Sequence, residues 1–239
     1  QREARLGADL HVCFDGQRDD ALGQSWFETR FLRWAPVLVQ GTTQRINDDL
    51  WPARDQTCHR VAYNFNGADL AVRRCNKLDL VIQAGGCVGV WPRYLRTIFS
   101  KVYTFEPSAE NYGLMVKNLG DLDVVKFNAA LSDKVGRCGL KLNPANCGDD
   151  QTVPGDEVET VTIDSLGVDP DLIYLDIQGD EHAALTGALE TLERCSPIVG
   201  IEVDNKLARL KGDAVALLKE LGYVQFGKSN QDWLFERFT

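Results

Sequence analysis

Long hydrophobic runs are absent from this chain of 239 residues, and no two of its 7 cysteines stand in a C-x-x-C spacing. A membrane-spanning helix needs roughly 20 apolar residues in a row, and no stretch approaches that length. The opening decapeptide QREARLGADL lacks the apolar core of a secretory signal. The sequence therefore predicts reduced thiols in a cytoplasmic protein, although Cys138 and Cys147 could pair.

Positive charge is also scarce, and it is unevenly spread. The chain has 26 Lys and Arg against 35 Asp and Glu, a formal net charge of −9. An acidic protein is a poor non-specific binder of phosphate backbones, so we expect no nucleic-acid partner. Residues 1–75 hold 10 charges of each sign and no lysine, because the first is Lys77. This shift predicts an N-terminal extension, residues 1–75, followed by a main domain, residues 76–239.

The N-terminal extension is predicted to contain a helix and a β-hairpin. Apolar residues recur at helical spacing over residues 21–35. Asn66 and Gly67 suit the positive-φ positions of a type I′ turn between extended pieces 61–65 and 68–72. The aromatic side chains of the predicted helix could contact a substrate, pack on the main domain, or join two copies of the chain: Trp26, Phe27, Phe31 and Trp34.

The main domain alternates apolar runs of strand length with helical stretches. Alternating strands and helices build parallel sheets through right-handed crossovers. The predicted fold class is α/β, with a doubly wound, mostly parallel seven-stranded sheet and an antiparallel C-terminal hairpin. The predicted core strands are 78–82, 101–105, 123–127, 171–176 and 197–203, and the predicted helices start at Pro92 or span 108–119, 181–195 and 214–222.

A ligand site is expected where the parallel strands end, since open α/β sheets bind ligands there. A glycine-rich turn, residues 83–89, follows the first strand, and Glu106 ends the second. An acid at that place can accept hydrogen bonds from the ribose hydroxyls of a nucleoside cofactor. Gly85 and Gly89 do not fit G-x-G-x-x-G, which disfavours an NAD-linked oxidoreductase and favours S-adenosylmethionine. A tight β–α turn beside a solvated Glu106 is the structural alternative.

Several motifs between residues 78 and 236 occur in an order and spacing that can be compared with known families. They read IQAGGCVG, VYTFEPSAENYGLMVKNL, VVKFNAALSD, VTIDSL, LIYLDIQGDEHAALTGALETL, IVGIEV and DWLF. In order and spacing they resemble the FkbM family of S-adenosylmethionine-dependent methyltransferases. The resemblance implies a Rossmann-like fold, S-adenosylmethionine as cofactor, and methylation of a hydroxyl on a sugar or secondary metabolite.

The resemblance also implies which residues bind the cofactor. The glycine-rich turn would pass beside its methionine part, and Glu106 would hold its ribose. The residues after the second and third strands would flank the adenosine. The implied cofactor-binding residues are Gln83, Ala84, Gly85, Gly86, Gly89, Glu106, Pro107, Ser108, Asn128 and Ala129.

Asp176 is the first candidate for a catalytic base, because the resemblance places it at the methyl-transfer site. Glu181 and His182, which open the following helix, come second. A strand-ending Asp can also cap the next helix, and acids in a first helical turn are favoured by the helix dipole. Asp176 could join Glu202 and Asp204 in a magnesium site, but we expect no metal.

Four positions depart from the family pattern. The family usually has an acid at Gln83, Asn at Cys87, Lys at Tyr174 and Glu at Gln178. Losing a charge-assisted contact costs about 1.5–3 kcal/mol. A methyltransferase-fold protein with weak or no catalysis, used as a binding or assembly module, is therefore the alternative function.

Overall fold

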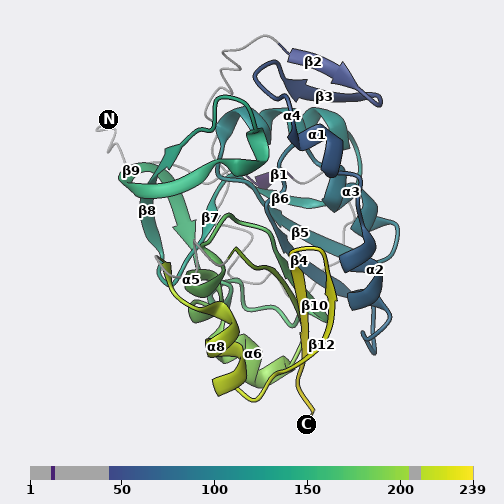
Figure 1. The fold of residues 1–239 in the computed structure, drawn as a ribbon, viewed down its shortest axis with the longest axis vertical. Coiled ribbons are helices and arrows are strands. Elements are labelled where there is room, and N and C mark those ends of the chain that lie inside the picture. Colours follow the sequence, from purple (N-terminus) through teal and green to yellow (C-terminus); the bar gives the residue numbers. More distant parts are fainter. Residues whose placement is uncertain (1–11, 14–42, 205–210, 239) are drawn as a thin grey trace, which may run out of the picture.

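A doubly wound sheet forms the centre of the molecule. The computed structural model describes residues 12–13, 43–204 and 211–238 (Figure 1). Its largest sheet has the strand order β1-β6-β5-β4-β10-β11-β13-β12. The neighbours from β6 to β11 are parallel, while β1 and the β12–β13 hairpin pair antiparallel. The strands are β1 (Val12–Cys13), β4 (Leu80–Ala84), β5 (Lys101–Phe105), β6 (Val125–Phe127), β10 (Leu172–Leu175), β11 (Ile198–Glu202), β12 (Val224–Ser229) and β13 (Asp232–Glu236).

This sheet confirms the predicted seven strands and their antiparallel C-terminal hairpin, and β1 adds an eighth strand that the sequence did not suggest. Strand order reverses between β4 and β10: the chain first moves outward through β5 and β6, then crosses to β10 and β11. Ligands of such sheets bind at the carboxyl ends of the strands beside this reversal.

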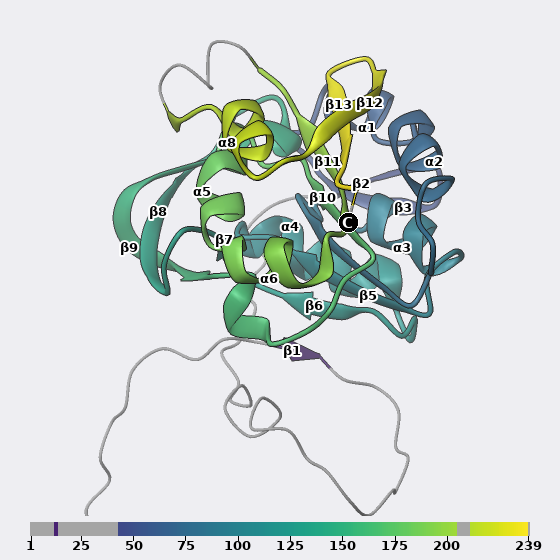
Figure 2. The ribbon, with the colours of Figure 1, turned by 90° about the horizontal axis from the view of Figure 1, so that it is seen from below.

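Helices cover both faces of the sheet, as the two ribbon views show (Figures 1 and 2). Val81 of β4 and Tyr174 of β10 pack against α2, α3 and α4. Their neighbours Ile82 and Ile173 point to the opposite face and pack against α5, α6 and α8. The helices are α1 (Cys58–Val61), α2 (Asn66–Val72), α3 (Val90–Arg96), α4 (Ala109–Leu119), α5 (Glu181–Thr186), α6 (Leu189–Cys195) and α8 (Ala214–Glu220), with 3-10 turns η1 (Cys147–Asp149) and η2 (Asp164–Leu166).

The hairpin predicted over residues 61–72 is wrong, because this segment forms α1 and α2. Ala68 and Ala71 are fully buried against the sheet, so helical packing decides the conformation. A Cβ at Gly67 would overlap the hydroxyl of Tyr174, so this glycine allows the helix to approach β10 closely. The hairpin of this region lies earlier instead, and its strands are β2 (Thr43–Ile46) and β3 (Asp49–Pro52).

Another difference concerns helix limits. The helix predicted over residues 181–195 is divided into α5 and α6, with Gly187 at the end of α5. A Cβ at Gly187 would overlap the carbonyl oxygen of Ser132, which explains the glycine there. The helix predicted over 21–35 lies outside the described residues.

A smaller sheet stands beside the main one. Its order is β7-β9-β8, and the long β8–β9 hairpin carries the turn η1 in its connection. The strands are β7 (Ala130–Leu131), β8 (Gly136–Lys141) and β9 (Gln151–Val161). Within the described ranges, none of the helices combines the length and apolar character that crossing a bilayer requires.

Candidate active site

A cavity of about 390 Å³ lies at the carboxyl ends of β4, β5 and β10, beside the reversal of strand order. Its wall includes three parts of the chain besides the β12–β13 turn, which contributes Asn230, Gln231 and Asp232. The sheet contributes the glycine-rich turn, Glu106 and Asp176; the β8–β9 connection contributes residues 147–150; and the segment before the sheet contributes residues 58–64. Cavities of this size hold small molecules and cofactors.

Gly85 is required by the geometry of the glycine-rich turn. Its φ is +87°, and a Cβ there would overlap the carbonyl oxygen of Asp176. Its N–H and that of Gly86 both donate to the carbonyl of Phe105, at 3.1 and 2.9 Å. The turn is therefore tied to the ends of both β5 and β10, which brings these strand ends together at one cavity.

Glu106 faces this turn. Its carboxylate accepts hydrogen bonds from the backbone N–H groups of Cys87 (2.7 Å) and Ser108 (2.8 Å). Burial raises its pKa to about 8, against the lowering effect of these two donors. The amide of Asn128 donates to the carbonyls of Glu106 (2.8 Å) and Pro107 (3.2 Å), which fixes the loop after β5. Two backbone N–H groups thus fix the position of the Glu106 carboxyl on the cavity wall.

Asp176 and Glu202 form a carboxyl pair on the opposite wall. The amide of Gln178 donates to both, at 3.3 Å to Asp176 and 3.1 Å to Glu202. Burial raises the pKa of each, while their mutual hydrogen bond lowers that of Asp176 and raises that of Glu202. Protonation of the pair is therefore favoured at Glu202 over Asp176. Gln178 has a φ of +55°, a costly conformation for a side-chain-bearing residue that occurs mostly at functional sites.

The other two catalytic candidates do not line this cavity. Glu181 accepts hydrogen bonds from the N–H groups of Ile177 (3.1 Å) and Gly179 (3.3 Å), so it holds the loop that carries Gln178. Burial raises the pKa of Glu181 to about 7. His182 lies on α5 beside Gly212. The N-cap of α5 is Asp180, so Asp176 does not cap that helix.

The cofactor-binding candidates divide into two groups. Gln83 is buried behind the wall, where its amide donates to the carbonyl of Ala84 and accepts from the Thr104 hydroxyl at 2.6 Å. It therefore contributes no polar group to the cavity. Ala84, Gly85, Glu106, Pro107 and Ala129 line the cavity, whereas Gln83, Gly86, Gly89, Ser108 and Asn128 do not.

Three cysteine thiols also stand on the wall, and sequence reasoning missed them as a group. Cys58 begins α1, Cys87 lies in the glycine-rich turn, and Cys147 begins η1. The Sγ of Cys87 lies 3.6 Å from that of Cys147 and 4.0 Å from that of Cys58. All three are free, as is Cys138, so the pairing of Cys138 with Cys147 does not form. No sequence signal marks the group, because its members lie far apart in the chain.

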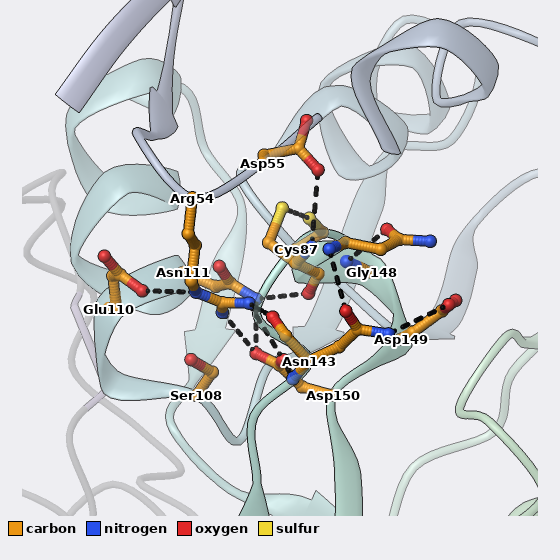
Figure 3. Close-up of polar contacts among 12 residues, drawn as sticks. Arg54, Asp55, Cys87, Ser108, Glu110, Asn111, Asn143, Gly148, Asp149 and Asp150 are labelled. Atoms are coloured by element: carbon orange, nitrogen blue, oxygen red, sulfur yellow. Dashed lines mark hydrogen bonds and ion pairs between the residues drawn. The ribbon is translucent and has the colours of Figure 1, made fainter. Parts of the chain in front are cut away.

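A network of ion pairs fixes the β8–β9 connection over the cavity (Figure 3). The guanidinium of Arg54 bonds to Asp150 at 2.7 Å and to Glu110 of α4 at 2.9 Å. Asp150 also accepts from the N–H of Asn143 at 2.8 Å, and Arg54 donates to the carbonyl of Asn143. Residues before the sheet are thereby joined to the loop that closes one side of the cavity.

Comparisons with known proteins identify the family of the chain. Residues 83–224 match the model of the methyltransferase FkbM domain. Among solved structures, the methyltransferase FkbM from Methylobacillus flagellatus is 16% identical at a TM-score of 0.45, with 67% of this chain and 43% of that chain covered. A Streptococcus mutans protein in complex with SAH is 15% identical at a TM-score of 0.44, with 77% and 99% covered.

An rRNA methylase from Streptococcus thermophilus is 14% identical at a TM-score of 0.45, with 72% of this chain and 93% of that chain covered. With 43% of the Methylobacillus protein covered, the chain spans less than half the length of that protein. The search of curated proteins gave no match.

Proposed function

The chain belongs to the FkbM methyltransferase family, and from this premise we propose that it transfers a methyl group from S-adenosylmethionine to a hydroxyl of a sugar or another small metabolite. The observation that carries the proposal is the meeting of Glu106, the glycine-rich turn and Asp176 at one cavity. The methyl donor follows from the family, and the hydroxyl acceptor is our inference from the polar groups on the cavity wall.

The cavity suits S-adenosylmethionine in shape and charge. Gly85 leaves room beside the turn, and the Glu106 carboxylate is positioned to accept hydrogen bonds from vicinal hydroxyls. Gln83 supplies no charge, but the carboxyl groups of Glu106, Asp150 and Asp176 reach the wall. Asp150 is paired with Arg54 and the pKa of Glu106 is raised, so Asp176 is the group whose charge would favour a cationic donor over its neutral demethylated product.

The carboxyl pair is suited to accept the proton of an alcohol. When bound, S-adenosylmethionine supplies an electrophilic methyl group. An alcohol has a high pKa, so a base within hydrogen-bond reach of its proton would assist transfer. We assign this role to Asp176, the ionised member of the pair, with Glu202 keeping the shared proton and Gln178 fixing the orientation of both carboxyls.

Amide and aromatic side chains on the wall support a hydroxyl-rich acceptor. Asn64, Gln178, Asn230 and Gln231 line the cavity, and each amide can both donate to and accept from a hydroxyl. Trp91 adds an apolar ring on which a sugar face could pack. Because Asn64 precedes the main domain, we propose that the N-terminal extension takes part in acceptor binding. A cytoplasmic location and a non-nucleic-acid acceptor remain part of this proposal.

Isothermal titration calorimetry with S-adenosylmethionine, followed by a radiolabelled methyl-transfer assay on a panel of sugars and hydroxylated metabolites, tests the proposal. We expect binding of one cofactor per chain and transfer to at least one hydroxyl acceptor. No heat at millimolar cofactor would reject the enzyme and leave the binding module. Cofactor binding with transfer to rRNA alone would reject the small-molecule acceptor while keeping the methyltransferase.

A further inference from the structure

We propose that Cys58, Cys87 and Cys147 form a binding site for one Zn²⁺ ion on the wall of the active-site cavity. The proposal is independent of methyl transfer, since it concerns three thiols to which the mechanism above gives no role. It departs from the sequence-based expectation that the protein holds no metal.

The spacing of the sulfur atoms matches that of a zinc–thiolate site. Zn–S bonds of about 2.3 Å in tetrahedral geometry place neighbouring sulfurs about 3.8 Å apart. The Cys87 Sγ lies 3.6 Å from that of Cys147 and 4.0 Å from that of Cys58, and all three sulfurs lie within 4.8 Å of one another. A disulfide would need about 2.05 Å, so the thiols are spaced for a shared ion rather than for a bond between them.

Two buried acidic side chains, Asp55 and Glu106, hold the backbones of all three cysteines. One oxygen of Asp55 accepts from the N–H groups of Cys58 (3.1 Å) and Cys147 (3.3 Å). Glu106 accepts from the N–H of Cys87 at 2.7 Å. The thiols are therefore positioned by the fold before any ion binds, which lowers the entropic cost of binding.

The local backbone also makes room for the thiols. A Cβ at Gly148 would lie 2.7 Å from the Sγ of Cys58, so a larger residue at this position would collide with the cluster. Cys87 adopts a φ of +44°, a costly conformation that tends to be kept where function needs it. Gly148 and the positive φ of Cys87 thus both belong to the part of the cavity wall that holds the thiols.

Three thiols select a thiophilic ion over Mg²⁺ or Ca²⁺, which prefer oxygen ligands. Zinc is normally four-coordinate, and a site with three protein ligands leaves the fourth position for water or a bound ligand. Among the described residues the cluster supplies three ligands. Binding would release one proton from each thiol and give the site a net charge of −1. The ion would join α1, the glycine-rich turn and η1 at one point.

The test uses the full chain, reduced with a phosphine and loaded with Zn²⁺ or Co²⁺ after removal of bound metal. We expect inductively coupled plasma mass spectrometry to find one zinc per chain. We also expect zinc to raise the melting temperature, and Co²⁺ to give a sulfur-to-cobalt charge-transfer band. Less than about a tenth of an equivalent of zinc, or Co²⁺ without that band, would overturn the proposal. Preferential Cu(I) binding, or a Cys87–Cys147 disulfide that persists under reduction, would overturn it as well.

Matched serine variants locate the site. We expect Cys58→Ser, Cys87→Ser and Cys147→Ser each to lower zinc affinity by at least about tenfold, while Cys75→Ser leaves it unchanged; an equal effect of all four variants contradicts the proposal. Asp55→Asn, which weakens the support of two ligands and the contact of Asp55 with His59, should lower zinc affinity by about 10–100-fold. Far-UV circular dichroism checks that each variant folds. Calorimetry with S-adenosylmethionine on the zinc-free protein keeps failure of this site separate from failure of the proposed function.

Discussion

The two walls of the cavity hold their carboxyl groups in different ways. On the wall of β4 and β5, Glu106 accepts hydrogen bonds from two backbone N–H groups. On the wall of β10 and β11, Asp176 and Glu202 have one side-chain donor in common, the amide of Gln178. Backbone donors fix a carboxylate in place, which suits binding. A carboxyl pair with one shared proton can take up another, which suits catalysis. We therefore propose that the first wall binds the cofactor and that the second carries out proton transfer.

The largest effect is expected on the second wall. Asp176→Asn should lower the rate of methyl transfer by about 10²–10⁴-fold, the usual contribution of a general base, and leave cofactor affinity nearly unchanged. Glu202→Gln is the matched control, because an amide resembles the protonated carboxyl and should preserve most of the rate. Initial rates and calorimetry measure the two quantities. Equal losses in both variants would remove the distinction between the members of the pair.

The next effect concerns the turn that joins the two walls. Gly85→Ala should destabilise the protein by about 2–5 kcal/mol, from the cost of a positive φ and the overlap with the Asp176 carbonyl. Gly167→Ala has a positive φ of 62° and no atom within 4 Å of the added Cβ, so it should cost only about 1–2 kcal/mol. Urea unfolding compares them, and similar values would show that the close approach is not rigid.

A smaller effect is expected on the first wall. Above about pH 8, where Glu106 is ionised, Glu106→Gln should weaken S-adenosylmethionine binding by about 1.5–3 kcal/mol, or roughly ten- to a hundredfold, because a charge-assisted acceptor is lost. The rate at saturating cofactor should change little. Calorimetry gives the affinity and initial rates give the turnover. A Glu106→Gln variant that binds the cofactor normally but transfers methyl groups slowly would contradict the assignment, because it would give Glu106 the catalytic role.

The pH dependence of stability tests the environment of Glu106 separately from ligand binding. Burial raises the pKa of Glu106 to about 8, above that of the unfolded chain, so the folded state holds its proton more tightly. The contribution of Glu106 to stability is then full below the unfolded pKa and is lost as pH rises through about 8. Relative to Glu106→Gln, the free energy of unfolding should fall by up to about 1.4 kcal/mol per pH unit over this window. Parallel pH profiles of the two proteins would contradict the raised pKa.

Much of the fold could be predicted because it depends on local pattern. The apolar runs that become β4, β10 and β11 are buried on both faces, and β5 is buried except at Lys101 and Tyr103; such runs are typical of central parallel strands. The same logic gives the position of Glu106 and Asp176, since each directly follows one of these strands. The sequence therefore predicted that Glu106 and Asp176 lie at strand ends, where the structure has a cavity.

The parts that could not be predicted depend on tertiary contacts. Asn66 and Gly67 read as a hairpin turn, yet Gly67 serves the approach of α2 to Tyr174. The three thiols come from positions 58, 87 and 147, and no spacing rule joins them. Glu202 entered the sequence analysis only as one possible metal ligand, because its partnership with Asp176 requires β10 and β11 to lie side by side.

A crystal structure of the chain with S-adenosylhomocysteine tests the central claim most directly. The account predicts the ribose hydroxyls within hydrogen-bond distance of the Glu106 carboxylate, the glycine-rich turn beside the homocysteine part, and the sulfur facing Asp176. A ligand bound elsewhere, or a cavity that stays without ligand at millimolar concentration, would contradict it.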